Sequence, residues 1–193
     1  SLWRIMTKDR MKHLILFFSA AVFLLFTESA VSAQQIVYAD ASAFPLYGKV
    51  SEDTDGRYER LPSHLKTVSR EPVWYLGRNS AGLYIRFRSN STSIHLRWES
   101  MFNNSMTHMT DTGTKGLDLY ALQDGEWRHV CSAQPQGKKS ERAVIRYMDP
   151  IEREYMLYLS LYDGISSLEI GVDEGASLDM PTVDSPSSER PVV

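Results

Sequence analysis

Residues 83–98 carry the most regular alternation of apolar and polar side chains in the sequence. Segments 83–88 and 94–98 both repeat with a period of two, which is typical of β-strands that bury one face. A turn-like stretch at 89–92 separates them, so we predict that the two strands form a hairpin. The side chains expected to face the core are Leu83, Ile85, Phe87, Ile94, Leu96 and Trp98.

A second hairpin is predicted where strands at 117–122 and 126–131 flank Asp124-Gly125, because Asp-Gly tolerates the positive φ of a tight turn. Helix is expected only around 57–61, since no long window after the first 33 residues sustains an apolar stripe of helical period. Further strands are expected at 36–39, 73–76, 143–147, 155–161 and 168–172, the fourth of these with Tyr155, Leu157, Leu159 and Leu161 on one face. The chain should therefore fold as an all-β, jelly-roll-like sandwich of about eight or nine antiparallel strands.

The two ends of the sequence differ from the middle. Met11-Lys12-His13 precede the uniformly apolar run 14–26, and small residues follow up to Ala33. These are the parts of a secretory signal peptide, and the run is shorter than the about 20 residues that span a bilayer. We predict cleavage after Ala33 and export to the periplasm or the cell exterior, with no membrane segment in the mature protein.

From Asp179 onward the chain is rich in Pro, Ser and charge, the composition of a linker, before Val192-Val193 begin a new apolar segment. We therefore divide the chain into upstream residues and signal peptide (1–33), a β-sandwich domain (34–180) and a linker into a further domain (181–193).

Composition excludes several classes of function. The chain has 21 basic and 24 acidic residues, a net charge of −3, so it lacks the basic excess that holds a nucleic-acid backbone. Cys131 is the only cysteine, which rules out an internal disulfide framework and a multi-thiolate metal site. We expect no nucleic-acid partner, no metal and no cofactor.

Few residues are candidates for chemistry. His108 lies in a long, polar, Met-rich connection, 101–113, and loops of this kind are often functional. Its methionines either pack on a partner or cap the open end of the sandwich, and the sequence leaves both readings open. Asp118 and Tyr120 should share one strand face, where the carboxylate is able either to orient His108 or to accept a backbone N–H.

Gly116-Leu117-Asp118-Leu119-Tyr120 matches the Gly-x-Asp-Leu-Tyr signature of a family of N-terminal domains. These domains precede the catalytic domain in SGNH-hydrolase-type (GDSL-like) esterases, especially exported ones of Bacteroidetes-like bacteria. The resemblance continues through 72–83, 103–113, 161–164 and 168–172, and so covers most of residues 36–180. The architecture that it implies is a jelly-roll-like sandwich followed by a flavodoxin-like α/β hydrolase domain.

The resemblance implies that this chain is not itself an enzyme. The family's Gly-Asp-Ser nucleophile block and Asp-x-x-His block do not occur in the sequence, while residues 190–193 resemble the approach to the first strand of the hydrolase domain. The implied role is a non-catalytic accessory domain that shapes the ester site of a hydrolase domain in the same polypeptide, or engages a carbohydrate-linked ester. The positions expected to face that site are Asn103, His108, Asp118 and Tyr120.

A free-standing, secreted, lectin-like module is the alternative. It would hold sugars on exposed aromatic rings, for which the candidates are Trp74, Tyr84, Trp98 and Trp127.

Overall fold

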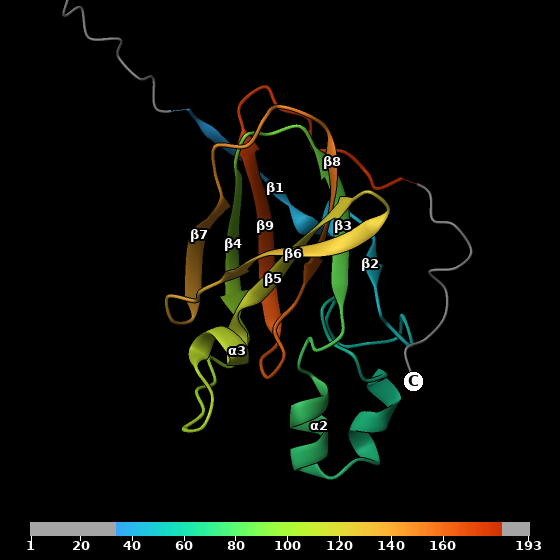
Figure 1. Cartoon of the computed structure of the whole chain (residues 1–193). Coiled ribbons are helices and arrows are strands. Elements are labelled where there is room, and N and C mark those ends of the chain that lie inside the picture. The colour runs from blue at the N-terminus through green and yellow to red at the C-terminus, as the bar shows by residue number, and fades with distance from the viewer. Residues whose placement is uncertain (1–33, 183–193) are drawn as a thin grey trace, which may run out of the picture. The chain divides into compact units, whose positions relative to one another are not determined.

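A computed structural model describes residues 34–182; the predicted signal peptide and most of the predicted linker lie outside these residues. Two antiparallel sheets make up this part (Figure 1). One has four strands in the order β1 (Ile36–Asp40), β9 (Ile165–Asp173), β4 (Ile94–Ser100) and β7 (Lys139–Ile145). The other has five in the order β2 (Leu46–Tyr47), β3 (Tyr84–Ser89), β8 (Arg153–Tyr158), β5 (Leu117–Gln123) and β6 (Glu126–Ala133). The predicted all-β sandwich is confirmed.

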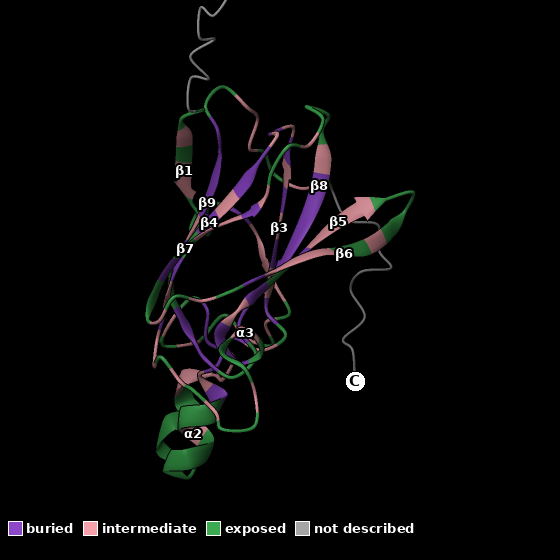
Figure 2. Ribbon diagram, turned by 60° about the vertical axis from the view of Figure 1, so that its left-hand side comes forward, coloured by how far each residue is buried: buried purple, intermediate pink, exposed green. Residues whose placement is uncertain are grey.

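The apolar faces of the two sheets meet in a single core, which appears in purple in Figure 2. All six side chains predicted to be buried in 83–98 are at most 2% exposed. Burying one Leu, Ile or Phe side chain stabilises a fold by about 1.5–3 kcal/mol, so the alternation in this segment supplies much of the driving force for folding.

The hairpin predicted for 83–98 is wrong. β3 pairs with β2 and β8, whereas β4 pairs with β7 and β9, so the chain crosses from one sheet to the other at residues 90–93. The buried carboxylate of Asp173, at the end of β9, organises this crossing by accepting hydrogen bonds from Ser91, Thr92 and Ser93. The strands face each other across the core instead of lying side by side.

The second hairpin is confirmed. β5 and β6 pair along their whole length, and the turn between them has φ values of 54° at Asp124 and 79° at Gly125. Both residues lie in the left-handed region, as a two-residue hairpin turn requires.

The strand predicted at 73–76 is a helix. α2 (Glu71–Gly77) begins with an acidic residue and a proline in its first turn, where the missing proline N–H costs no hydrogen bond and negative charge is favourable. The helix predicted at 57–61 is also wrong, because the turn of helix follows Pro62 as η2 (Ser63–Thr67). The remaining helical segments are η1 (Ala41–Ala43) and α3 (Asp111–Lys115). α2 and α3 lie at the same end of the sandwich (Figure 1).

Most strand boundaries differ from the prediction by a residue or more, and three differ most. β7 begins at Lys139 instead of 143, β9 begins at Ile165 instead of 168, and β8 ends at Tyr158 instead of 161. Beyond β8 the chain turns outward, so Leu161 is half exposed although Tyr155, Leu157 and Leu159 are buried as expected. In the described part of the chain, none of the helices has the length and apolar character needed to cross a membrane.

Candidate functional site

Asp118 and Tyr120 lie on the outer face of the five-stranded sheet, opposite the buried Leu117 and Leu119, as the alternation predicts. Asp118 Oδ1 accepts a hydrogen bond of 2.5 Å from Ser132 Oγ on β6 and lies 4.0 Å from Nε2 of His129. Among residues 34–182, no hydrogen bond or ion pair joins Asp118 to His108. The carboxylate therefore orients groups on the neighbouring strand and not the loop histidine.

The trio of Asp118, His129 and Ser132 has the composition of a catalytic triad but not its connections. In a triad the serine donates to the histidine, and the carboxylate holds the other ring nitrogen. Here Ser132 Oγ donates to Asp118. A single nitrogen of His129, Nε2, faces both partners, at 3.2 Å from Ser132 Oγ and 4.0 Å from Oδ1 of Asp118. The side chains of Asp118 and His129 are also about half exposed. The trio is suited to hydrogen-bond a polar ligand and not to activate a nucleophile.

A row of aromatic rings crosses the same face. We call Tyr47, Tyr84, Tyr158 and Tyr120, which come from β2, β3, β8 and β5, the tyrosine row. Their ring centroids follow one another at 5.2, 5.1 and 5.7 Å, and His129 on β6 continues the row 5.3 Å from Tyr120. Burial raises the pKa of Tyr47, Tyr84 and Tyr158, so their hydroxyls stay neutral and are able to donate hydrogen bonds at neutral pH. The row combines apolar ring surface with polar edges.

A buried ion pair lies beside the tyrosine row. Arg86 on β3 donates from Nε to Oε1 of Glu154 on β8 at 2.9 Å, and Nη2 contacts the same oxygen. The guanidinium also lies 5.6 Å from the ring centroid of Tyr47 and 5.5 Å from that of Trp127. Thr182 Oγ1 donates to the other oxygen of Glu154, so the last described residue lies against this face of the sheet.

Asn103 belongs to a second group of residues, in the loop that leads from β4 to α3. Its backbone has φ of 61°, and its Oδ1 accepts a 2.8 Å hydrogen bond from Nζ of Lys115. Lys115 is only 2% exposed, and Nζ also lies 3.2 Å from Oδ2 of Asp111. Hydrogen bonds from Ser105 and then Lys115 lower the pKa of Asp111, which stabilises the negative charge of this pair. The buried lysine fixes the start of the loop to α3.

A buried aspartate fixes the same loop from the other side. Asp163 is fully buried, and its two oxygens accept the backbone N–H groups of Phe102 at 3.0 Å and Asn104 at 2.7 Å. Asn104 then donates to the carbonyl of Tyr162 and accepts from the hydroxyl of Tyr75 on α2. The loop, α2 and residues 161–164 thus form one hydrogen-bonded unit.

His108 lies at the exposed tip of the loop, which the bridge between Met106 and Met109 closes. Met101, Met106 and Met109 are all half-buried, and Met101 lies close to Gly164. These positions favour the interpretation in which the methionines cap the end of the sandwich.

The four candidate residues thus fall into two groups. Asp118 and Tyr120 are adjacent on the outer face of the sheet, and Asn103 and His108 share the loop before α3. Lys115, Ser132 and Asp163 were missed, because nothing in the local sequence pattern distinguishes them from exposed polar residues. The contact of Asp118 with Ser132 follows only from the pairing register of β5 and β6, which shifts by one residue between Leu119 and Tyr120.

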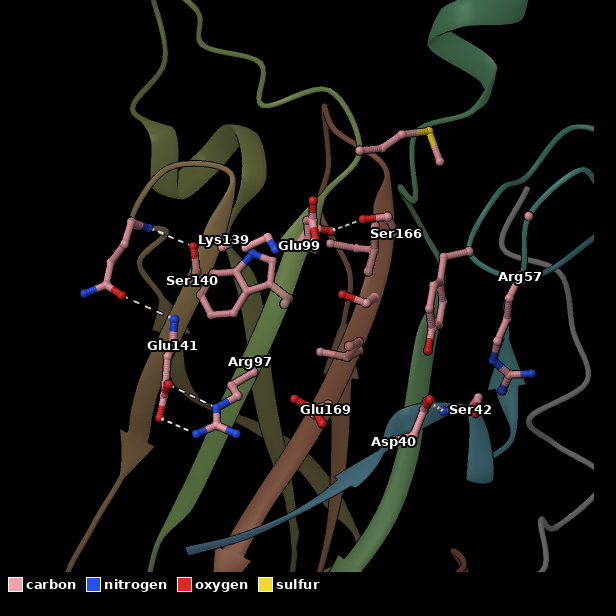
Figure 3. Close-up of a pocket in the computed structure, with 18 residues that line it drawn as sticks. Asp40, Ser42, Arg57, Arg97, Glu99, Lys139, Ser140, Glu141, Ser166 and Glu169 are labelled. Carbon is pink, nitrogen blue, oxygen red and sulfur yellow. Dashed lines mark hydrogen bonds and ion pairs between the residues drawn. The ribbon is translucent and has the colours of Figure 1, made fainter.

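A separate hollow of about 810 Å³ lies on the four-stranded sheet, and none of the four candidates lines it (Figure 3). Its charged groups are largely engaged with one another. Arg97 forms a two-pronged ion pair with Glu141, and Lys139 lies 3.6 Å from Glu99. The lining includes no group of three or more metal-ligating side chains, nor does any other region of residues 34–182. Because its charges already compensate one another, the hollow is a weaker candidate than the tyrosine row.

Comparison with known proteins matches residues 36–178 to the GxDLY family, described as the N-terminus of SGNH-hydrolase-type esterases. Among solved structures, a candidate GDSL-like lipase from Bacteroides ovatus ATCC 8483 is 34% identical, with a TM-score of 0.73 over 77% of this chain and 44% of its own. The salicylyl-acyltransferase SsfX3 from a tetracycline biosynthetic pathway is 21% identical, with a TM-score of 0.55 over 81% of this chain and 44% of its own, and shares the fold alone. Curated proteins give no match. The chain spans less than half the length of either structure.

Proposed function

Because the chain belongs to the GxDLY family of N-terminal domains of SGNH-hydrolase-type esterases, we propose that it is a non-catalytic accessory domain of an exported ester hydrolase. In this role it works beside a hydrolase domain of the same polypeptide and engages the carbohydrate part of an ester substrate. The proposal includes the signal peptide of residues 1–33 as the route of export.

The observation that carries the carbohydrate proposal is the tyrosine row with its adjoining polar trio. Sugars present apolar C–H faces and many hydroxyls, so their sites combine aromatic surface with a few well-placed polar groups. The tyrosine row offers the first, and Asp118, His129 and Ser132 offer an acceptor, an imidazole and a hydroxyl at its end. Trp127 adds a further ring, whereas Trp98 is buried in the core and unavailable.

The same trio supports a non-catalytic role. A nucleophilic serine needs a base within hydrogen-bond reach and a donor pair for the oxyanion. Nε2 of His129 lies 3.2 Å from Ser132 Oγ, but the hydroxyl donates its hydrogen to the Asp118 carboxylate and not to this base. The sequence also contains neither the nucleophile block nor the Asp-x-x-His block of the family. Asn103 and His108, in the loop fixed by Lys115 and Asp163, are proposed to face the ester site of the hydrolase domain.

A free-standing lectin-like module is a second candidate, favoured by the same tyrosine row. The two functions differ in what the domain does beside a hydrolase domain. An accessory domain lowers the KM of the hydrolase domain for a carbohydrate-linked ester, whereas a free-standing lectin leaves this KM unchanged. Neither alters the turnover of a simple aryl acetate.

Binding and hydrolysis by the 193-residue chain test the proposal. We expect calorimetry with acetylated oligosaccharides to detect binding that Asp118→Ala and Tyr120→Ala each weaken at least tenfold. His129→Ala should also weaken binding. Its matched control is His95→Ala, which removes a strand histidine on the other sheet and should leave binding unchanged. The chain should not hydrolyse an aryl acetate above background. Hydrolysis at an enzymic rate that Ser132→Ala abolishes would overturn the non-catalytic role, and no binding to any acetylated glycan would overturn the carbohydrate role.

A further inference from the structure

One end of the sandwich exposes a group of large apolar side chains that the core does not use. Val73, Tyr75 and Leu76 on α2, together with Leu161 and Tyr162, are each between 37% and 52% exposed. Phe102 joins them, with its ring centroid 4.3 Å from that of Tyr75. We call these six residues the apolar patch. Monomeric proteins rarely expose contiguous apolar surface of this kind unless it binds something.

Hydrogen bonds connect the segments that form the apolar patch. Asn104 accepts from the hydroxyl of Tyr75 and donates to the carbonyl of Tyr162, which joins α2 to residues 161–162. The loop residue therefore lies between the two halves of the patch and holds them together.

The patch is also rigid. Arg78, just after α2, forms two 3.0 Å hydrogen bonds with the buried carboxylate of Glu59 and lies 5.5 Å from the ring centroid of Phe102. The buried carboxylate of Asp163 accepts hydrogen bonds from the backbone N–H groups on either side of Asn103. A surface fixed in this way loses little conformational entropy when a partner covers it, which favours stable docking.

The path of the chain indicates what covers the patch. Asp179 forms an antiparallel bridge with Arg88, and residues 177–182 run back along β3 toward its first residue, Tyr84. That end of β3 follows directly from α2. The described chain therefore ends at Thr182 while running toward the end that carries the patch. β1, by contrast, begins at the opposite end, where Ile36 pairs with Asp173.

We propose that the apolar patch is the surface on which the hydrolase domain of the same polypeptide packs. The inference rests on the proposed function, which supplies that domain, and on the finding that this chain spans 44% of the length of its structural relatives. Asn103 and His108 lie in the loop beside the patch, so docking there would also bring them toward the hydrolase domain.

Hydrogen exchange tests the proposal in the polypeptide that carries both domains, with the 193-residue chain as reference. We expect amides of 71–77 and 161–162 to exchange at least tenfold more slowly when the hydrolase domain is present. The exposed segment around Tyr147 and Ile151 should be unchanged and serves as the internal control. Unchanged exchange at 71–77 and 161–162 would overturn the proposal. The proposal would also fail if the 193-residue chain alone protected these amides equally well and the protection rose with protein concentration, because a second copy would then cover the patch.

Substitutions separate this inference from the proposed function. Leu76→Asp with Leu161→Asp should convert one cooperative thermal transition of the two-domain protein into two, while Ile151→Asp, at an equally exposed position outside the patch, should not. If the two-domain protein cleaves carbohydrate-linked esters but the patch remains unprotected, the docking surface is wrong and the proposed function stands. If the patch is protected but Asp118→Ala leaves KM for those esters unchanged, docking stands and the carbohydrate role fails.

Discussion

Removing the carboxylate of Asp163 is the sharpest test of how the loop before α3 is held. In Asp163→Ala, the backbone N–H groups of Phe102 and Asn104 lose the acceptor that binds them at 3.0 and 2.7 Å. Both groups are then left in a part of the structure that water reaches poorly, because Asp163 is fully buried.

The cost follows from the two orphaned donors. An unsatisfied buried polar group costs about 1–3 kcal/mol, and some relaxation of the exposed loop tip will recover part of this. We therefore expect the free energy of unfolding to fall by about 2–4 kcal/mol. For a domain of this size, 1 kcal/mol corresponds to a shift of about 2–4 °C in Tm, so the variant should melt roughly 4–16 °C lower.

Urea unfolding of the 193-residue chain, followed by tryptophan fluorescence, measures the loss directly, and hydrogen exchange of the Phe102 and Asn104 amides localises it. Asp118→Ala is the matched control, because its half-exposed carboxylate leaves no buried donor behind and should change stability by less than about 0.5 kcal/mol. A loss below about 1 kcal/mol in Asp163→Ala, with both amides still protected, would refute this account of the loop.

Three further substitutions test other parts of the structure. Lys115→Met should change the free energy of unfolding by less than about 1 kcal/mol, because methionine keeps the packing of the lysine stem and leaves only exposed acceptors behind. It should nevertheless speed amide exchange at 103–105 by about tenfold. If Lys115→Met destabilises the fold as much as Lys115→Ala does, the ion pair itself stabilises the fold. Burial acts to raise the pKa of Asp173, but hydrogen bonds from Ser93, Thr92 and Ser91 outweigh it and lower the pKa below 3.8, so this residue stabilises the fold above pH 3.8 and loses that effect as the pH falls further. Asp173→Asn should cost about 3 kcal/mol at pH 7, and acid titration of stability should show the difference from wild type shrinking below pH 3.8; a constant difference down to pH 2 contradicts the assignment. Burial and hydrogen bonding to Glu141 raise the pKa of Tyr38 from 10.0 to about 12, so the stability that the neutral hydroxyl contributes is present below pH 10 and lost between pH 10 and 12. The difference in unfolding free energy between wild type and Tyr38→Phe should therefore narrow over that range, and a difference that widens would contradict this role of Tyr38.

The faces of the strands could be predicted, but their partners could not. Alternation fixes which side chains of 83–98 point inward, because successive residues on a strand face opposite sides of the sheet. It does not say whether the two strands lie in one sheet or in two. That choice depends on Asp173, some 80 residues away, whose carboxylate organises the crossing between them.

α2 shows how local preference misleads. Val73-Trp74-Tyr75-Leu76 has the β-branched and aromatic composition of a strand. The pair Glu71-Pro72 before it is a helix-start signal that the prediction did not weigh. The apolar side chains of α2 remain exposed as a result, so the error in secondary structure also concealed the apolar patch.

Lys115 and Ser132 were beyond reach for a different reason. A lysine is almost always exposed, and the burial of Lys115 depends on acceptors supplied by Asn103 and Asp111. Ser132 lies opposite Asp118 only because of a β-bulge between Leu119 and Tyr120, which shifts the register by one. In an unbroken ladder from the Asp124-Gly125 turn, Cys131 would occupy that place.

The Gly-x-Asp-Leu-Tyr motif can be divided by what each position does. A Cβ on Gly116 would lie 2.3 Å from the carbonyl oxygen of Thr112 and 2.8 Å from that of Ala133, so only glycine fits between the two backbones. Leu117 and Leu119 are buried in the core. Asp118 and Tyr120 point outward and contribute little to the core, so packing does not explain their identity. Because β5 starts directly after Lys115, which fixes the loop, these two side chains lie where the tyrosine row meets the end that carries the apolar patch. A ligand held by Asp118 and Tyr120 would therefore lie next to a domain docked on the patch, which is the arrangement that an accessory domain for a carbohydrate-linked ester requires.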